Sequence, residues 1–371
     1  MRIAIDARKL HDYGIGTYVR NLLREFAHED GGHTYVLLCR KVDEADLRAQ
    51  SPRFETLVEH AGNYSIREQL TVPWDLWRAG VDVFHAPHYV VSPFTPRPYV
   101  VTIHDCIHLR FPQYLPNRAA YVYARAMMTI AARRASKILT VSKASKDDIL
   151  HFLGVPDHKV EVVYNGLDQR LVASPPPDAI ERVRDRFMLT SPFILYTGNI
   201  KPHKNVDRLI EAYALLRQRG HGDVKLIIIG EEISRFPSLR RLVHRHQLHG
   251  QVRFFGFVPD ATLSALYRLA SVFVFPSLYE GFGLPPLEAM ATGLPVITSN
   301  VSSLPEVVGD AALLIDPLDA KSIADAIARV LSEPALRADL VKRGYERAKA
   351  FSWSNAAARI REVYKELGAH A

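Results

Sequence analysis

The sequence is poor in cysteine, and this scarcity limits the structures that it can form. It has only two cysteines among 371 residues, Cys39 and Cys106, and they do not have CxxC spacing. We therefore expect neither a disulfide framework nor a zinc site, and we predict a reducing, cytoplasmic compartment. No apolar run approaches about twenty residues and no signal peptide precedes the first predicted strand, so we expect no membrane-spanning segment.

Charge of either sign is also modest, which leaves an ordinary globular composition. Hydrophobic residues make up 48% of the chain, charged residues 23%, and the formal net charge is +7. The length is too great for one small domain, so two domains are expected. No internal repeat or low-complexity tract is visible.

Short apolar runs alternate with segments of helical periodicity along the whole chain. This alternation predicts an α/β fold with parallel strands and crossover helices. We expect a first Rossmann-like domain over 1–172 and a second over 190–352. The stretch 171–191, which contains three consecutive prolines, is the expected connection between them. On such sheets ligands bind beyond the carboxyl ends of the strands, and we expect His85, His104 and Asn165 with Gly166 to lie at those ends.

The stretch Val272–Ser299 is the most informative part of the chain. It begins with the apolar run Val272–Phe275, typical of a buried parallel strand. A loop with two glycines follows, and Pro285 and Pro286 then stand where a helix would begin. Free N–H groups at such a helix start, beside glycines that permit close approach, favour binding of a phosphate.

Two carboxylates lie in this stretch, Glu280 on the loop and Glu288 on the predicted helix, with seven residues between them. Carboxylates beside a phosphate would repel it, so we expect them to hold neutral hydroxyl groups, for which a carboxylate is a strong acceptor. The alternative is a glutamate favoured by the helix dipole plus a surface glutamate.

The pattern Glu280-(seven residues)-Glu288, with Gly281-Phe282-Gly283 between, resembles the E-x7-E signature of the retaining glycosyltransferases of family 4. The resemblance implies the GT-B fold, with two Rossmann-like parallel-sheet domains facing a cleft and a C-terminal helix, 353–371, that crosses back to the first domain. It also implies that Glu288 binds the nucleotide ribose and Glu280 the donor sugar. The loop amides that would face the diphosphate and sugar are those of Gly281, Phe282, Gly283 and Leu284.

The segment Gly14-Ile15-Gly16 precedes a helix that we predict from Thr17 to Ala27. It is not a dinucleotide-binding fingerprint, because Val19 replaces the third glycine and the glycines come too late after the strand. In the resembling family, a glycine-rich loop at this place brings backbone N–H groups to the donor diphosphate, and Gly14 and Gly16 match it. A purely structural loop is the alternative.

His104 closes an apolar strand and is followed by Asp105. A histidine at this place can simply cap the strand through a backbone hydrogen bond. The family places a histidine here, near the reacting carbon of the donor sugar. The other histidines nearby, His85, His88 and His108, match no standard metal spacing, and a DxD motif is absent, so we expect no metal.

Lys204 stands just before a predicted helix, behind a strand and a loop, where its ammonium could contact a diphosphate. Many family members carry an arginine at the position of Asn199, and that arginine is absent here. Lys201, His203 or Arg8 could replace it. The sequence leaves these three candidates open.

No acidic residue occurs from Cys106 to Lys146, a segment that contains eight arginines and lysines. A predicted helix, Arg118–Arg134, carries aromatic and basic residues together, and we expect the stretch 110–146 to contact an anionic membrane. A solvated basic face over an ordinary core is the alternative. No nucleic-acid-binding module accompanies the charge, so nucleic acid is not an expected partner.

Five motifs in order carry the resemblance over nearly the whole chain: Gly14-Ile15-Gly16, His104-Asp105, Asn165-Gly166, Lys204-Asn205 and Glu280 to Glu288. They imply metal-independent, retaining transfer of a hexose from a nucleotide sugar by front-face attack. The residues expected at the reaction centre are Lys204, Glu280 and His104, with Asn199 beside the donor. No cofactor other than the nucleotide-sugar substrate is expected.

The chain looks most like bacterial mannosyltransferases of surface-polysaccharide assembly, so we predict GDP-mannose as donor, with UDP-glucose and other UDP-sugars as alternatives. The expected acceptor is a glycan or a polyprenyl-diphosphate-linked saccharide, met at the inner face of the membrane. Two other classes remain open: a nucleotide-sugar epimerase of the same fold and a non-catalytic sugar-nucleotide-binding protein.

Overall fold

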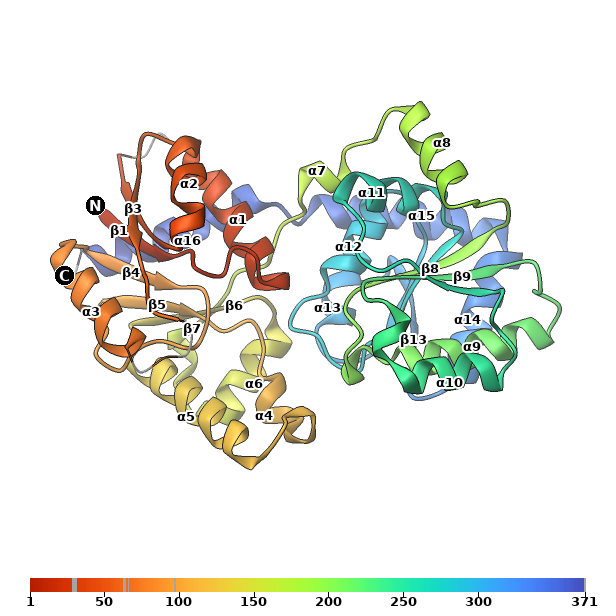
Figure 1. The fold of residues 1–371 in the computed structure, drawn as a ribbon, viewed down its shortest axis with the longest axis horizontal. Coiled ribbons are helices and arrows are strands. Elements are labelled where there is room, and N and C mark those ends of the chain that lie inside the picture. Colours follow the sequence, from red (N-terminus) through yellow and green to blue (C-terminus); the bar gives the residue numbers. More distant parts are fainter. Residues whose placement is uncertain (29–31, 63–64, 66, 97, 370–371) are drawn as a thin grey trace. The chain divides into compact units, whose positions relative to one another are not determined.

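The computed structural model describes residues 1–28, 32–62, 65, 67–96 and 98–369. The chain divides into two compact units (Figure 1). Unit 1 comprises Met1–Gly166 together with Ser352–Ala371, and unit 2 comprises Leu167–Phe351. Positions 370 and 371 of the predicted terminal segment lie outside the described residues. Within the described part of the chain, no helix is long and apolar enough to cross a bilayer.

Unit 1 is built on a seven-stranded parallel sheet with strand order β3-β2-β1-β4-β5-β6-β7. Its strands are β1 (Arg2–Asp6), β2 (Thr34–Cys39), β3 (Phe54–Val58), β4 (Val83–Ala86), β5 (Tyr99–Thr102), β6 (Lys137–Thr140) and β7 (Val160–Val162). Its helices are α1 (Tyr13–Ala27), η1 (Lys41–Asp43), α2 (Glu44–Gln50), α3 (Glu68–Arg78), α4 (Ile107–Arg110), η2 (Pro112–Tyr114), α5 (Arg118–Arg134), α6 (Lys143–Leu153), η3 (Asp157–Lys159) and α16 (Trp353–Gly368).

Alternate residues of these strands enter two separate cores, as the pleat of a strand requires. Ile3 and Ile5 of β1 pack with α1 and α16 on one face of the sheet. Ala4, between them, packs with α3, α5 and α6 on the other face. The last helix is therefore part of unit 1, although the whole of unit 2 separates it from the rest in sequence (Figure 1).

Unit 2 is built on a six-stranded parallel sheet with strand order β10-β9-β8-β11-β12-β13. Its strands are β8 (Phe193–Thr197), β9 (Lys225–Ile229), β10 (Val252–Phe254), β11 (Val272–Phe275), β12 (Val296–Ser299) and β13 (Ala312–Ile315). Its helices are α7 (Gln169–Val172), α8 (Pro177–Arg186), η4 (Pro202–Lys204), α9 (Val206–Gln218), η5 (Ile233–Arg235), α10 (Pro237–Arg245), α11 (Asp260–Leu269), α12 (Leu284–Ala291), α13 (Leu304–Val308), α14 (Ala320–Ser332) and α15 (Pro334–Lys349).

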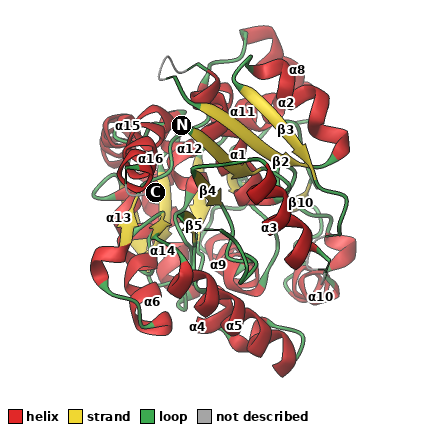
Figure 2. Cartoon of the chain, turned by 90° about the vertical axis from the view of Figure 1, so that its left-hand side faces the viewer, coloured by secondary structure: helices red, strands yellow, loops and turns green. Residues whose placement is uncertain are grey.

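The predicted α/β class with parallel strands is confirmed in both units, where helices and strands alternate (Figure 2). The stretch expected to connect two domains, 171–191, instead forms the end of α7 and all of α8. These helices belong to unit 2, where the Ser264 hydroxyl on α11 donates to the Leu171 carbonyl at 2.7 Å.

The first helix begins at Tyr13, so the expectation of a glycine loop before Thr17 is wrong. Gly14 and Gly16 lie in its first turn, and the Gly16 amide donates to the Asp12 carbonyl at 2.8 Å. A Cβ at position 16 would stand 2.3 Å from the Leu10 carbonyl oxygen, so a glycine is required there for packing. His85 is the penultimate residue of β4, at the carboxyl end of the strand as predicted.

Candidate functional site

Strands β8 and β11 are hydrogen-bonded neighbours, so the loops that follow them leave the same edge of the unit 2 sheet. From β8 the chain continues through β9 and β10 on one side of β8, and it then returns to the other side to form β11, β12 and β13. The boundary between β8 and β11 is therefore a topological switch point. In open α/β sheets such points bind ligands. The Leu278 amide donates to the His203 carbonyl at 2.7 Å and ties the two loops together.

Lys204 and Glu280 meet at this edge. The Lys204 ammonium lies 2.6 Å from Oε1 of Glu280 and 5.4 Å from the centre of the Phe275 ring. Both charged side chains are largely buried, being 14% and 12% exposed. A lysine ammonium has three hydrogen-bond donors, so this ion pair does not exhaust its capacity to bind an anion.

The loop that carries Glu280 is fixed by two serines that follow β12. The Ser302 hydroxyl donates to the Glu280 carbonyl at 2.7 Å, and the Ser303 hydroxyl donates to the Phe282 carbonyl at 2.7 Å. Gly283 ends the loop with a φ of 114°, a conformation that favours glycine. The loop is therefore pre-shaped, with its carbonyl groups turned toward the serines.

Helix α12 begins at Leu284, one residue before the predicted start. The next two residues, Pro285 and Pro286, have no N–H, so the first turn offers fewer amides to an anion than an ordinary helix start. The Leu284 amide is the helix-start donor that these prolines leave in place.

Glu288 lies one turn into α12 and is held by a tyrosine. The Tyr267 hydroxyl donates to Oε2 of Glu288 at 3.0 Å and in turn lies 3.0 Å from the Thr197 hydroxyl at the end of β8. Burial raises the pKa of Glu288 to about 7, with further contributions from the negative charges of Asp168 and Asp260, against the lowering effect of the Tyr267 hydrogen bond. A carboxylate in this setting gains from additional hydroxyl donors.

Asn199 follows β8 in a crowded segment. The Tyr196 hydroxyl donates to the Asn199 carbonyl at 3.1 Å. The amide oxygen Oδ1 of Asn199 is buried and has no hydrogen-bond partner among the residues that the structure describes. Buried polar atoms are usually paired, so this oxygen is a point where a ligand donor would be favoured.

Of the three cations that could replace the absent arginine, Arg8 is already engaged within unit 1. Its Nη2 lies 2.6 Å from Asp6, and its Nη1 lies 2.8 Å from Glu68. Burial alone would lower the pKa of Arg8, but the two carboxylates raise it overall. Lys201 is exposed on the loop that carries Lys204, whereas the His203 side chain is buried.

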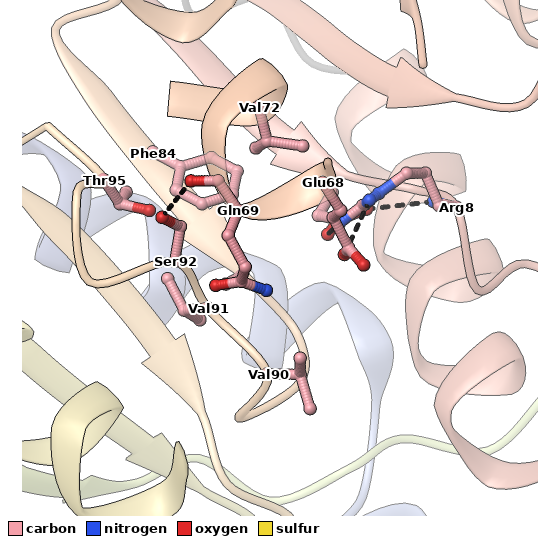
Figure 3. Close-up of a pocket in the computed structure, with 11 residues that line it drawn as sticks. Arg8, Glu68, Gln69, Val72, Phe84, Val90, Val91, Ser92 and Thr95 are labelled. Atoms are coloured by element: carbon pink, nitrogen blue, oxygen red, sulfur yellow. Dashed lines mark hydrogen bonds and ion pairs between the residues drawn. The ribbon is translucent and has the colours of Figure 1, made fainter. Parts of the chain in front are cut away.

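Figure 3 shows the pocket of unit 1 that Arg8 and Glu68 border. Its other side is lined by apolar residues, including Val72 and Phe84, and by Ser92, whose hydroxyl donates to the Gln69 carbonyl at 2.6 Å. The guanidinium in this pocket is already paired with the carboxylates of Asp6 and Glu68, so the pocket has no positive charge left for an anionic ligand.

His104 lies just beyond β5 in unit 1. Its Nε2 donates to the Pro87 carbonyl at 3.1 Å, and its ring meets the Tyr18 ring edge-on at 5.0 Å. Burial lowers the pKa of His104 despite the neighbouring Asp105. The imidazole is therefore neutral, with Nδ1 as an acceptor.

His85 serves the fold. Its Nδ1 lies 2.5 Å from the Tyr364 hydroxyl of α16 and its Nε2 lies 2.7 Å from the Thr102 hydroxyl. Burial lowers its pKa to about 3. Over the described ranges of the chain, the structure contains no group of three or more His, Cys, Asp or Glu side chains arranged to hold a metal ion.

The predicted site residues thus gather in two sets. Unit 2 brings together Lys204, Glu280 and the loop to Leu284, with Glu288 and Asn199 at the ends of neighbouring elements. Unit 1 holds Gly14, Gly16 and His104, where Tyr18 on α1 joins the glycine turn to the histidine.

Sequence reasoning did not find the residues that support this site. Tyr267 orients Glu288, and Ser302 and Ser303 shape the Glu280 loop. A polar pair directly after a buried strand is a signal that could have found the serines. Tyr267 lies in a helix of unexceptional composition and gives no such signal.

Comparison with known proteins identifies the family of the chain. Residues 13–171 match the model of the Glycosyltransferase Family 4, and residues 179–347 match that of the Glycosyl transferases group 1. An O-antigen chain mannosyltransferase B of Escherichia coli is 35% identical over 286 residues, which cover 77% of this chain and 74% of the relative.

Two further likenesses are more limited. A serotype-specific mannosyltransferase WbdA of Escherichia coli is 33% identical over 60% of this chain, which spans only 28% of that longer protein. The structure of HepE from Anabaena in complex with UDP-glucose superposes with a TM-score of 0.80 at 20% identity, covering 99% of this chain and 100% of the other. It supports the fold alone.

Two parallel-sheet Rossmann-like units and these matches define a glycosyltransferase with the GT-B fold. More narrowly, the chain belongs to glycosyltransferase family 4, and mannosyltransferases of O-antigen assembly are among its relatives.

Proposed function

We propose that this glycosyltransferase moves mannose from GDP-mannose to a saccharide acceptor with retention of anomeric configuration. The observation that carries the proposal is the meeting of Lys204 with Glu280 at the β8–β11 edge, one element away from Glu288. A nucleotide sugar has a dianionic diphosphate between two hydroxyl-rich sugars. One cation and two carboxylates fit that order of charges.

In this arrangement each acidic residue binds one sugar. Glu288 accepts hydroxyl hydrogens of the ribose, and Glu280 accepts hydroxyl hydrogens of the transferred hexose. Lys204 turns toward the diphosphate, assisted by the Leu284 amide. The unpaired Oδ1 of Asn199 accepts a further hydroxyl of the donor.

The transfer proceeds by front-face attack. The acceptor hydroxyl oxygen forms a bond to the anomeric carbon as the bond from that carbon to the β-phosphate oxygen breaks, and the departing phosphate oxygen takes the acceptor's proton. Lys204 stabilises the negative charge that develops on the leaving diphosphate. No protein nucleophile takes part, so Glu280 only positions the sugar, and His104, through Nδ1, is a further contact to the donor sugar.

Positive charge for the leaving group then comes from the protein and not from a metal. Lys204 is the principal source, and exposed Lys201 on the same loop is the second cation that we assign in place of the absent arginine. We do not assign Arg8 to that role, because its guanidinium is already paired with two carboxylates.

Mannose is chosen as the transferred sugar because relatives at 35% and 33% identity are named mannosyltransferases. The first of these relatives is named for the O-antigen chain, which supports a glycan or polyprenyl-diphosphate-linked acceptor. We place the enzyme in the cytoplasm, at the inner face of the membrane, with the basic stretch 110–146 in contact with anionic lipid. Both cysteines are buried free thiols, which suits a reducing compartment.

The test is a donor panel of GDP-mannose, UDP-glucose, UDP-GlcNAc and UDP-galactose, each assayed by thermal shift and by slow hydrolysis with and without EDTA. GDP-mannose should stabilise the protein most, and EDTA should leave turnover unchanged. A strict need for a divalent ion would overturn the mechanism. Epimerisation of the donor without an acceptor would identify an epimerase, and binding without any turnover a non-catalytic protein.

A further inference from the structure

Two of the chain's three tryptophans are exposed on one short helix. Trp74 and Trp77 of α3 are 57% and 67% exposed, and their ring centres lie 5.2 Å apart. The third tryptophan, Trp353, is 5% exposed. Tryptophan is among the most buried residue types on average, so an exposed pair marks a surface that contacts something.

Leu70, which is 60% exposed, lies one turn before Trp74 on the same helix. The opposite side of the helix packs into the unit 1 core through Val72 and Leu76. Leu70, Trp74 and Trp77 follow the spacing i, i+4, i+7, which places them on one face. The helix therefore has two apolar faces. Val72 and Leu76 on the inner face are buried, whereas Leu70, Trp74 and Trp77 on the outer face are exposed.

The loop after β4 adds a fourth apolar side chain. Phe94 is 66% exposed, and its amide donates to the Ser92 hydroxyl at 3.1 Å. Ser92 in turn donates to the Gln69 carbonyl in the first turn of α3, as Figure 3 shows. The loop is thereby fixed to the helix. We name the exposed side chains Leu70, Trp74 and Trp77 of α3, together with Phe94 of the loop bonded to α3, the aromatic patch.

Basic residues accompany the aromatic patch. Arg67 and Arg78 are exposed at the two ends of α3. Of the two acids on α3, Glu68 is buried against Arg8, and burial raises the pKa of Asp75.

The acid-free helix α5 packs on the same face of the unit 1 sheet as α3. Its outer side exposes Arg118, Arg125 and Arg133 together with Val122 and Tyr123. This side of unit 1 therefore combines exposed apolar side chains with positive charge.

We propose that the aromatic patch inserts into the interface of an anionic lipid bilayer. Tryptophan rings prefer the headgroup level of a membrane, and exposed arginines are attracted to anionic lipid at about 1 kcal/mol each. The charge selects a lipid surface over a neutral partner. The patch is distinct from the basic stretch 110–146, which supplies attraction but only two large exposed apolar side chains, Val122 and Tyr123.

The inference rests on the proposed function in one respect: the lipid is taken to be anionic because the basic stretch 110–146 is proposed to contact anionic lipid. The inference needs neither the donor nor catalysis. The two can fail separately, because the aromatic patch and the arginines of α5 are changed in different variants.

The experiment uses the intrinsic fluorescence of the full-length protein. Because Trp353 is buried, a change on adding lipid reports Trp74 and Trp77. Phosphatidylglycerol-rich vesicles should shift the emission to the blue, and phosphatidylcholine vesicles should have little effect. The double variant Trp74→Ser/Trp77→Ser should bind the anionic vesicles at least about tenfold more weakly in sedimentation, as expected for two lost apolar anchors.

The control is Phe257→Ser, which removes an equally exposed aromatic, 75% exposed, from unit 2 and should bind vesicles as the wild type does. The triple variant Arg118→Gln/Arg125→Gln/Arg133→Gln should weaken binding and reduce its salt dependence. A midpoint of thermal unfolding equal to that of the wild type would show that each variant is folded.

Three results would overturn the proposal: no blue shift with anionic vesicles, equal binding by the double tryptophan variant, or equal binding to neutral vesicles. If only the arginine variant lost binding, the basic contact would stand without the aromatic patch. A shift caused by soluble glycan in the absence of lipid would assign the patch to the acceptor instead.

Discussion

The two units place a buried cation at the same topological position and use it differently. Arg8 follows β1, and Lys204 follows β8, each at the point where the strand order of its sheet reverses. Arg8 contacts two carboxylates, whereas among the residues that the structure describes the Lys204 ammonium forms an ion pair with Glu280 alone. A switch point is therefore not sufficient to define a ligand site. The cation must also keep donors that the protein itself does not occupy.

The largest effect that would break this comparison is expected at Arg8. Replacing it in Arg8→Met leaves Asp6 and Glu68 as buried carboxylates without a cation, which should lower the free energy of unfolding of unit 1 by about 3–5 kcal/mol. Urea denaturation measures this. The matched control is Arg170→Met, which removes an arginine that is 56% exposed from its pair with Asp168 and should cost less than about 1 kcal/mol. Equal, small losses in both variants would refute the structural role of Arg8.

The next largest effect is expected on turnover at Lys204. The Lys204→Ala variant should transfer sugar about 10²–10³-fold more slowly at saturating donor, because one preorganised charge on the leaving group is lost. Product formation under single-turnover conditions is the measurement. Lys201→Ala, on the same loop, should lose less than about tenfold. Unchanged turnover of Lys204→Ala would exclude the mechanism.

The smallest effect sharpens the comparison by freeing Lys204 from its partner. In the Glu280→Gln variant, the Lys204 ammonium can contact the diphosphate without first breaking its ion pair with Glu280. The variant also lacks the negative charge that Glu280 places beside the diphosphate. The free nucleoside diphosphate of the donor should then bind about tenfold more tightly, or about 1.4 kcal/mol, while transfer falls. Isothermal calorimetry compares the two proteins. Weaker or equal binding would mean that the ion pair does not oppose the product.

Much of the fold could be predicted because local signals agreed with the final packing. Val272–Phe275 is entirely apolar and forms the buried strand β11 as expected. Helix α5 has the predicted limits because Asn117 caps it, accepting the Ala120 amide at 2.9 Å, and because residues after Arg134 lead directly into β6. In such segments no distant contact competes with the local preference.

Other features depend on contacts that a sequence pattern does not contain. Gly14 and Gly16 are poor helix residues, yet α1 includes them because the chain before it folds back and the Leu10 carbonyl packs on Gly16. The serines that hold the Glu280 loop lie 22 and 23 residues from it. The exposure of Trp74 and Trp77 was equally hidden, because Val72 and Leu76 on the same helix are buried.

The local positions of the candidate charged residues could be predicted, whereas the residues that support them could not. Glu280 lies on a loop, Glu288 on a helix and Lys204 directly before α9, as expected, and their roles in binding stay predictions. The pairing of Lys204 with Glu280 could not be foreseen, since they are 76 residues apart. It follows from the adjacency of β8 and β11, which is a property of the sheet.

Gly166 has a consequence for how the polypeptide could be rearranged. It is the last residue of unit 1 before the chain leaves, and a Cβ there would lie 2.0 Å from the backbone nitrogen of Trp353, where the chain returns. The exit and the re-entry are thus adjoining points, and the intervening 185 residues (167 to 351) form an insertion whose ends nearly touch. A linker of a few glycines from position 166 to position 352 would join the two parts of unit 1, and closing so short a loop has a small entropy cost. Unit 1 joined in this way, and unit 2 by itself, could then be made and crystallised as separate polypeptides.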